Sequence, residues 1–306
     1  MLLNRLKTTT PLTIIFFIIF AIFFWCLPIL NHAISDKYLH SFLSPFSIFI
    51  IGFILLLLHS IGLNNMIYEK DVIKKNSLVL APVFLLLATP FISQIESWII
   101  SFLLLFFLNT LFTLYQKERP FLYAFNASFL IGCIAIFYTD ILLLYCLNII
   151  AFLTFRNLSW RNFLISLLSV LLPFLFYWIY TFLFEIPLKI MLPTENLKPT
   201  KFSNIFTLGY AELSWYIIIG FILVFSFTEL LLWMTKKSIR SRKSFLLIIS
   251  YLVVCYFIKI DNSYFLIVTP LSVVLANFFV YSKRKRLTEV LFFLFVLSSI
   301  YYRISI

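Results

Sequence analysis

The sequence predicts an all-α protein, a polytopic transmembrane helical bundle. Hydrophobic residues make up 63% of the 306 residues and charged residues only 12%, whereas soluble domains carry about 45–50% and about 25%. Apolar runs near the length of about 20 residues that crosses a bilayer recur along the whole chain. Lys and Arg gather in alternate connections between these runs. We therefore expect about eleven spans (range about 9–12), with the N-terminus in the cytoplasm and the C-terminus outside.

The predicted spans are the apolar runs that charged or turn-forming residues interrupt. In chain order they are Pro11 to Asn31, Ser44 to Leu63, Leu78 to Phe91, Trp98 to Tyr115, Phe121 to Tyr138, Ile141 to Phe155, Phe163 to Phe184, Leu213 to Met234, Phe245 to Ile258, Tyr264 to Tyr281 and Thr288 to Tyr301. Several runs are short, so their ends must lie in the interface or the bilayer must thin locally.

Two of these boundaries depend on short polar breaks. An uninterrupted helix over residues 121–155 would be about 52 Å long, against a hydrocarbon core of about 30 Å, so the chain is expected to turn at Asp140. Residues 245–281 are broken by Lys259-Ile260-Asp261-Asn262-Ser263, a turn-forming run. Both segments are therefore predicted to be hairpins.

The distribution of basic residues tests these boundaries, because cytoplasmic loops carry an excess of Lys and Arg. With the N-terminus inside, 18 of the 24 basic residues fall in cytoplasmic segments. The outer segments hold the other 6, which are Lys37, Lys189, Lys198, Lys201, Lys259 and Arg303. Dropping either hairpin would break this alternation. The formal charge of +12 is thus explained by topology and by contact with an anionic lipid bilayer, not by nucleic acid.

The first span is interpreted as a retained signal anchor, because Arg5 and Lys7 precede a full-length apolar run without a small-residue cleavage site. The longest predicted extramembrane segment is an external loop. It divides the chain into a membrane module of about seven spans at 1–185, the external loop at 186–212, and a module of about four spans at 213–306.

Candidate catalytic residues lie in the first outer loop. Asp36 is flanked at four-residue spacing by His32 and His40, so all three would share a face of a short helix. Its carboxylate could act as a base or contact a cation bound to a phosphate. The alternative is that this acid, like Glu96, Asp140 and Asp261 in other outer turns, caps a turn or a helix N-terminus. No metal site is predicted, because the third histidine, His59, lies in the second span.

Polar residues inside the predicted spans form a second group of candidates. Glu229 is the most membrane-embedded acid and could serve a proton or ion relay, or pair with Lys236. Asn126 and Asn148 could line a polar path, or hydrogen-bond neighbouring helices together. The four cysteines all lie in predicted spans without paired spacing and are interpreted as small apolar residues.

Short motifs recur at the ends of the predicted spans between about residues 6 and 185. They are Lys7-Thr8-Thr9-Thr10-Pro11, Leu63-Asn64, Lys75-Asn76-Ser77, Ala124-Phe125-Asn126-Ala127-Ser128-Phe129-Leu130-Ile131-Gly132, Phe137-Tyr138, Phe155-Arg156-Asn157-Leu158-Ser159-Trp160-Arg161 and Leu172-Pro173-Phe174. In these motifs the chain resembles a family of Bacteroidota polytopic inner-membrane proteins of unknown function. The family motif centres on Arg156, Trp160 and Arg161. The resemblance implies a multi-pass protein of the bacterial inner (cytoplasmic) membrane.

The cofactor is unknown. Some members of that family have carried the label of a carotene-cleaving oxygenase. Iron in such an enzyme needs several histidine ligands, and three scattered histidines argue against it.

Three functions compete. The architecture resembles that of membrane glycosyltransferases that use polyprenyl-phosphate-linked substrates to build envelope glycans, and Lys189, Lys198, Lys201 or Arg303 would then bind the lipid phosphate. A transporter or flippase would instead use Glu229, Asn126 and Asn148. An accessory subunit of an envelope assembly complex is the third. The sequence leaves open whether the chain is an enzyme.

Overall fold

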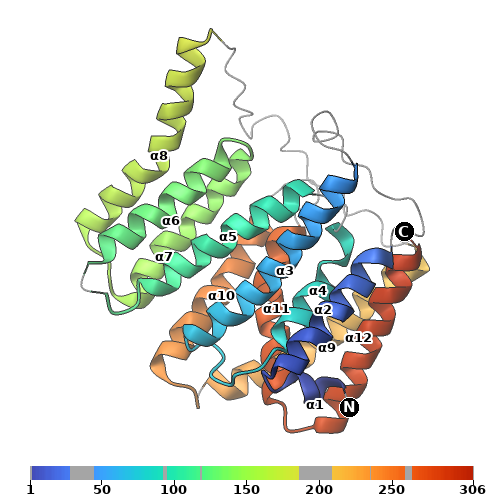
Figure 1. Ribbon diagram of the computed structural model, residues 1–306. Helices are drawn as coiled ribbons and strands as arrows, with labels where there is room; N and C mark the ends of the chain where they lie inside the picture. The colour runs from blue at the N-terminus through green and yellow to red at the C-terminus, as the bar shows by residue number, and fades with distance from the viewer. Residues whose placement is uncertain are drawn as a thin grey trace. The chain divides into compact units, whose positions relative to one another are not determined.

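The computed structural model describes residues 2–27, 45–91, 95–117, 119–185, 209–234, 236–258 and 264–305 (Figure 1). Within these residues every regular element is helical, so the predicted all-α class is confirmed. The elements are α1 (Leu2–Leu6), α2 (Pro11–Cys26), α3 (Pro45–Glu69), α4 (Leu80–Leu87), η2 (Thr89–Phe91), α5 (Ile95–Thr113), α6 (Pro120–Ala135), η3 (Thr139–Leu144), α7 (Tyr145–Phe155), α8 (Trp160–Leu183), α9 (Tyr210–Met234), α10 (Ile239–Phe257), α11 (Tyr264–Tyr281) and α12 (Lys285–Ser305).

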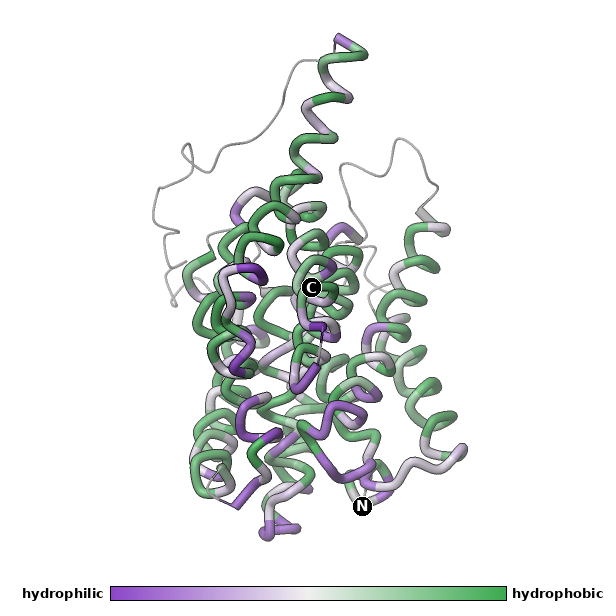
Figure 2. Tube along the Cα trace, turned by 90° about the vertical axis from the view of Figure 1, so that its left-hand side faces the viewer, coloured by the Kyte–Doolittle hydropathy of each residue, from purple (hydrophilic) through white to green (hydrophobic). Residues whose placement is uncertain are grey.

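Helices that could cross a membrane are present throughout the described chain. Five are long and apolar enough by length and composition, namely α3, α5, α8, α9 and α12. Shorter apolar helices are α2, α6, the η3–α7 segment and α11. In Figure 2 the helices are hydrophobic along most of their length, and hydrophilic residues gather in the connections between them. The chain is therefore an all-α protein with several helices suited to a lipid bilayer.

The structure differs from the prediction at residues 78–91. The α-helix there covers only Leu80–Leu87, and all its residues are buried. Eight residues rise about 12 Å, less than half of the hydrocarbon core. The α-helix ends before Pro90, which has no backbone N–H for an α-helical hydrogen bond, and Thr89–Phe91 form the 3-10 helix η2. This run was wrongly predicted as a full span, because hydropathy does not separate a lipid-facing helix from a protein-buried one.

Contacts divide the chain into two compact units. Unit 1 consists of Met1–Ile99, Lys201–Ser238 and Tyr264–Ile306, and unit 2 consists of Ile100–Thr200 and Ile239–Ser263. Each unit is thus assembled from segments that are far apart in the sequence. The division at 1–185, 186–212 and 213–306 follows the order of spans along the chain, and it stays a prediction.

In unit 1, α4 packs against α3 and α11, while α9 packs against α11 and α12. The buried His59 of α3 stacks on Phe84 of α4 with 4.3 Å between ring centroids. Basic connections meet at one end of this unit. Lys7 lies close enough to Lys75 and Lys285 for their charges to lower its pKa further, after the larger effect of burial.

In unit 2, α6 packs against α8, and α7 packs against α10. The predicted break near Asp140 is present: α6 ends at Ala135, η3 follows, and α7 packs back on α6. The predicted turn at 259–263 lies outside the described residues. Basic residues gather here too, because Arg240 and Lys243 of α10 both lie over the ring of Tyr115, at 5.6 and 5.7 Å.

Candidate functional site

The residues predicted to be catalytic lie outside the described residues. Asp36, His32 and His40 fall within residues 28–44, and Lys189, Lys198 and Lys201 fall within residues 186–208. Their roles stay predictions. Among the described residues, no group of three or more His, Cys, Asp or Glu side chains could hold a metal ion.

The residues on which the predicted family resemblance centres, Arg156, Trp160 and Arg161, lie in and beside a capped turn between α7 and α8. Arg156 ends α7 in the left-handed conformation, with φ at 60°. The Ser159 hydroxyl accepts a hydrogen bond from the backbone N–H of Asn162, at 3.2 Å, and so caps α8. Trp160 is 73% exposed, and the guanidinium of Arg161 lies 4.9 Å from the ring centre of Phe121. These contacts are consistent with a structural role at the end of unit 2.

The polar residues of the predicted spans do not share one environment. Asn148 is fully buried and donates from Nδ2 to the Ser128 hydroxyl at 2.9 Å, so it joins α7 to α6. Asn126 lies on the exposed face of α6. Glu229 belongs to unit 1, and its Oε2 is buried without a hydrogen-bond partner in the described part of the chain. The interpretation of Asn148 as a link between helices agrees with these contacts.

The acids of the outer turns mostly begin helices. Glu96, Asp140 and Glu212 lie in the first turns of α5, η3 and α9. Carboxylates are stabilised at helix N-termini by the helix dipole. The first-turn positions of these three acids are consistent with the capping alternative.

A donor-rich site lies where α2 and α12 end. Arg303 is only 1% exposed, and its guanidinium carbon lies 4.3 Å from the ring centre of Phe24 and 5.9 Å from that of Trp25. Trp25 is 3% exposed and packs on Phe49 and Trp98 at centroid distances of 5.5 and 6.1 Å. We call Phe24, Trp25 and Arg303 the Arg303 site.

The polar atoms of the Arg303 site are hydrogen-bond donors that lack acceptors. Nε, Nη1 and Nη2 of Arg303 and Nε1 of Trp25 are buried and have no partner among the residues that the structure describes. Guanidinium and indole groups donate and cannot accept. A buried, unpaired cation costs several kcal/mol. The site is therefore suited to a ligand that is both anionic and rich in acceptors, such as a phosphate or a carboxylate.

An arginine at the C-terminus of a membrane helix can usually be explained without a ligand. The helix dipole attracts its charge, and its long side chain can reach the polar interface. Arg303 does lie in the last turn of α12. Its near-complete burial against aromatic rings is not snorkelling, however. The sequence predicts Arg303 as one of four alternative phosphate contacts and does not single out Trp25, because an indole at the end of a span usually marks only the membrane interface.

A second buried cation lies in the connection between α9 and α10. Lys237 Nζ donates to Asn277 Oδ1 at 2.8 Å and lies 5.0 Å from the ring centre of Tyr281. The Tyr281 hydroxyl in turn accepts from the backbone N–H of Lys74 at 3.0 Å. Burial lowers the pKa of Lys237 from its ordinary 10.5 to about 8. This lysine joins the α9–α10 connection to α11, whose Tyr281 in turn contacts the connection between α3 and α4, and it is assigned a structural role.

The low pKa of Lys237 predicts a pH dependence of stability. Between about pH 8 and its ordinary pKa of 10.5, the unfolded chain retains a proton that the folded chain has lost, so the free energy of unfolding rises with pH. We expect the melting temperature of the wild type to rise by a few degrees relative to Lys237→Gln as the pH increases through this window. The exposed neighbour gives a matched control, Lys236→Gln, which should show no such trend. If the difference in melting temperature between wild type and Lys237→Gln stayed constant across this pH window, the lowered pKa of Lys237 would be contradicted.

Fold and site together define a class: an all-α protein with several helices able to cross a membrane, and with a buried, donor-only site at the paired ends of α2 and α12. Comparison of the chain with protein-family models, curated proteins and solved structures finds no match. The function is therefore argued from the site itself.

Proposed function

We propose that this chain is a multi-pass protein of the bacterial inner membrane that processes envelope glycans or lipid-linked sugars, as a glycosyltransferase-like enzyme with an outward-facing site. The observation that carries the proposal is the Arg303 site, with its buried donors and no acceptor among the described residues. A polyprenyl-phosphate-linked sugar offers phosphate oxygens, which guanidinium groups bind in a bidentate manner. The aromatic walls of the site exclude water and would strengthen that contact.

The charge distribution within unit 1 supports an outer position for the Arg303 site. Lys285, at the start of α12, lies near Lys7 and Lys75 at the basic end of the unit. Arg303 follows 18 residues later, which is about 27 Å along the helix. The positive-inside rule assigns the basic end to the cytoplasm, so Arg303 would lie outside. This is consistent with the proposed orientation, with the N-terminus in the cytoplasm and the C-terminus outside.

The segment that follows α2 supplies the chemistry in this proposal. Asp36 comes 11 residues after Trp25 in the sequence and acts as the base or the cation contact, with His32 and His40 beside it. Lys189, Lys198 and Lys201 of the external loop supply further contacts to the lipid phosphate. The bacterial inner membrane is proposed from the resemblance to the Bacteroidota family, which stays a prediction.

The transporter alternative has less support. It needs Asn126, Asn148 and Glu229 along one path, but Asn126 is exposed and Asn148 is hydrogen-bonded to Ser128.

Gene deletion with complementation tests the proposal. We expect the deletion strain to lose an envelope glycan and to accumulate a polyprenyl-linked sugar. The wild type and the control Lys283→Gln, a change at an exposed basic residue, should restore the glycan, whereas Asp36→Asn and Arg303→Gln should not. Mass spectrometry of glycans and lipid extracts provides the readout. Unchanged glycans and lipid intermediates after deletion would refute the enzymatic proposal.

A further inference from the structure

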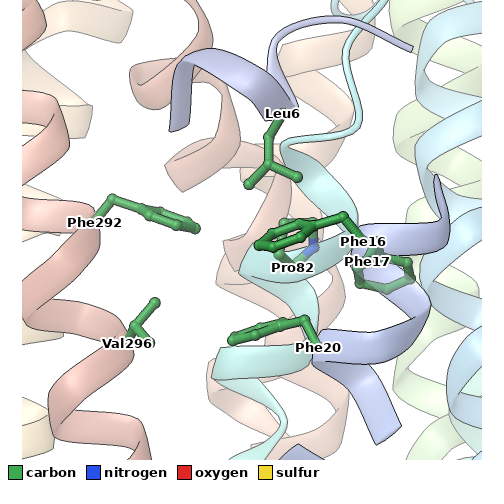
Figure 3. A pocket seen from close by; sticks show the side chains of 7 residues that line it. All are labelled: Leu6, Phe16, Phe17, Phe20, Pro82, Phe292 and Val296. Atoms are coloured by element: carbon green, nitrogen blue, oxygen red, sulfur yellow. The ribbon is translucent and has the colours of Figure 1, made fainter. Parts of the chain in front are cut away.

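An apolar pocket lies between α2 and α12 on the same helix faces as the Arg303 site. It has a volume of about 40 Å³ and is lined by Leu6, Phe16, Phe17, Phe20, Pro82, Phe292 and Val296. Figure 3 shows Phe16 and Phe20 of α2 pointing toward Phe292 and Val296 of α12, with Pro82 of α4 behind Phe16, Leu6 of α1 at one end and Phe17 farther from α12.

The pocket and the Arg303 site lie along one strip of unit 1. On α12, Phe292, Val296 and Arg303 are spaced by four and seven residues and therefore share a face. On α2, Phe17, Phe20 and Phe24 share a face in the same way, because they are spaced by three and four residues. The two helices run parallel, since Phe24 meets Arg303 near their C-terminal ends while the earlier phenylalanines meet Phe292 and Val296. The pocket begins about 10 Å along α12 from Arg303.

This strip has an apolar section, which is the pocket, and a cationic section, which is the Arg303 site. The described lining of the pocket contains no polar side chain, and Phe16 is 38% exposed, so the pocket opens on an apolar surface of the helices. Neighbouring side chains on α2, such as Ile15 and Ile19, are also exposed. A ligand can therefore approach sideways from lipid, with its charged group toward the end that carries Arg303.

We propose that this strip binds one polyprenyl monophosphate, with the phosphate at Arg303 and Trp25 and the first isoprene units along the apolar faces of α2 and α12, where a methyl branch enters the pocket. The proposal rests on the proposed function and names the lipid that the site holds. Because the guanidinium of Arg303 is a cation, charge complementarity requires an anionic group on the ligand. The pocket has room only for a small group such as a methyl branch, and its four phenylalanines suit an unsaturated, methyl-branched chain that can pack against aromatic faces.

Lipid binding by the purified full-length protein tests the inference. Native mass spectrometry would follow titrations with undecaprenyl phosphate, with phosphatidic acid and with inorganic phosphate. We expect the wild type to bind undecaprenyl phosphate at least about tenfold more tightly than phosphatidic acid, which is about 1.4 kcal/mol. Inorganic phosphate alone should bind weakly, because it gains nothing from the pocket.

Two variants separate the sections of the strip. Val296→Trp fills the pocket and should weaken binding of undecaprenyl phosphate about tenfold or more. Leu297→Trp makes the same change on the exposed side of α12, where Leu297 is 47% exposed, and should leave binding unchanged. Arg303→Gln should abolish the preference of the protein for undecaprenyl phosphate over the uncharged alcohol, undecaprenol. If Val296→Trp fails to fold, Phe16→Ala removes one wall of the pocket and should also weaken binding.

The outcomes distinguish this inference from the proposed function. Equal binding by wild type, Val296→Trp and Phe16→Ala would refute the position of the tail. Equal affinity for phosphatidic acid would refute the choice of a prenyl lipid, and tight binding of inorganic phosphate alone would refute the need for a tail. If gene deletion leaves the glycans unchanged while these binding results hold, only the enzymatic proposal fails.

Discussion

Replacing Arg303 with methionine is expected to raise the melting temperature of the ligand-free protein. The same change should abolish binding of the phosphate group of the lipid. The guanidinium is buried, and three of its nitrogens lack acceptors in the described residues, so the folded state bears an uncompensated desolvation cost. Methionine fills similar space and can contact Phe24 and Trp25 through its sulfur. The lost cation–π contact is worth about 1–2 kcal/mol. Replacement of buried charges by apolar residues is often neutral or stabilising by about 1–4 kcal/mol.

Thermal unfolding in detergent or nanodiscs, without added lipid, measures this effect. We expect a rise of several degrees for Arg303→Met. The control Arg286→Met, at an exposed position, should change the melting temperature little, because surface charges contribute little to stability. A marked fall for Arg303→Met would mean that the guanidinium is paired in the ligand-free protein, for example by an acid of segment 28–44, and would count against an open anion site.

Substitution of Gly132 by valine is expected to unfold unit 2 or to lower its stability severely. A Cβ atom at Gly132 would lie 2.5 Å from the carbonyl oxygen of Val170 and 3.0 Å from Cγ of Pro173. Backbone atoms of α8 cannot move aside without separating the two helices. That separation would also strain the hydrogen bond from the Ser169 hydroxyl to the Phe125 carbonyl, which is 2.7 Å long. Overpacking of this kind costs about 1–3 kcal/mol or more.

Limited proteolysis and thermal unfolding would report the loss, with new cleavage sites expected in α6 and α8. Gly220→Ala is the matched control, because a Cβ at Gly220 meets no atom within 4 Å. That change should be neutral or stabilising by up to about 1 kcal/mol, since alanine favours a helix over glycine. Pro173→Ala should not rescue Gly132→Val, because the carbonyl of Val170 remains in place. Normal stability of Gly132→Val would contradict the close packing of α6 on α8.

The candidate site was only partly predictable. Arg303 could be named as a phosphate ligand from its place in an outer segment, but nothing in its sequence neighbourhood indicates burial. Trp25 could not be singled out, since its value as a donor arises only when Arg303, Phe49 and Trp98 enclose it. Asn126 and Asn148 both lie in apolar runs of the sequence, but Asn126 is exposed on the surface of α6 whereas Asn148 joins α7 to α6. Helix-face assignment fails where a helix is apolar all round.

The all-α class, the approximate positions of most helices and the grouping of basic residues in the connections could be predicted from the amino-acid sequence. These properties are local: hydropathy, turn-forming residues and charge act over a few neighbouring residues. Three features became visible only in the folded chain: α4 is a short buried helix, each unit combines distant segments, and Arg303 is buried on the same helix face as an apolar pocket. Burial depends on which distant side chains surround a residue, and chain order does not encode that in any local pattern.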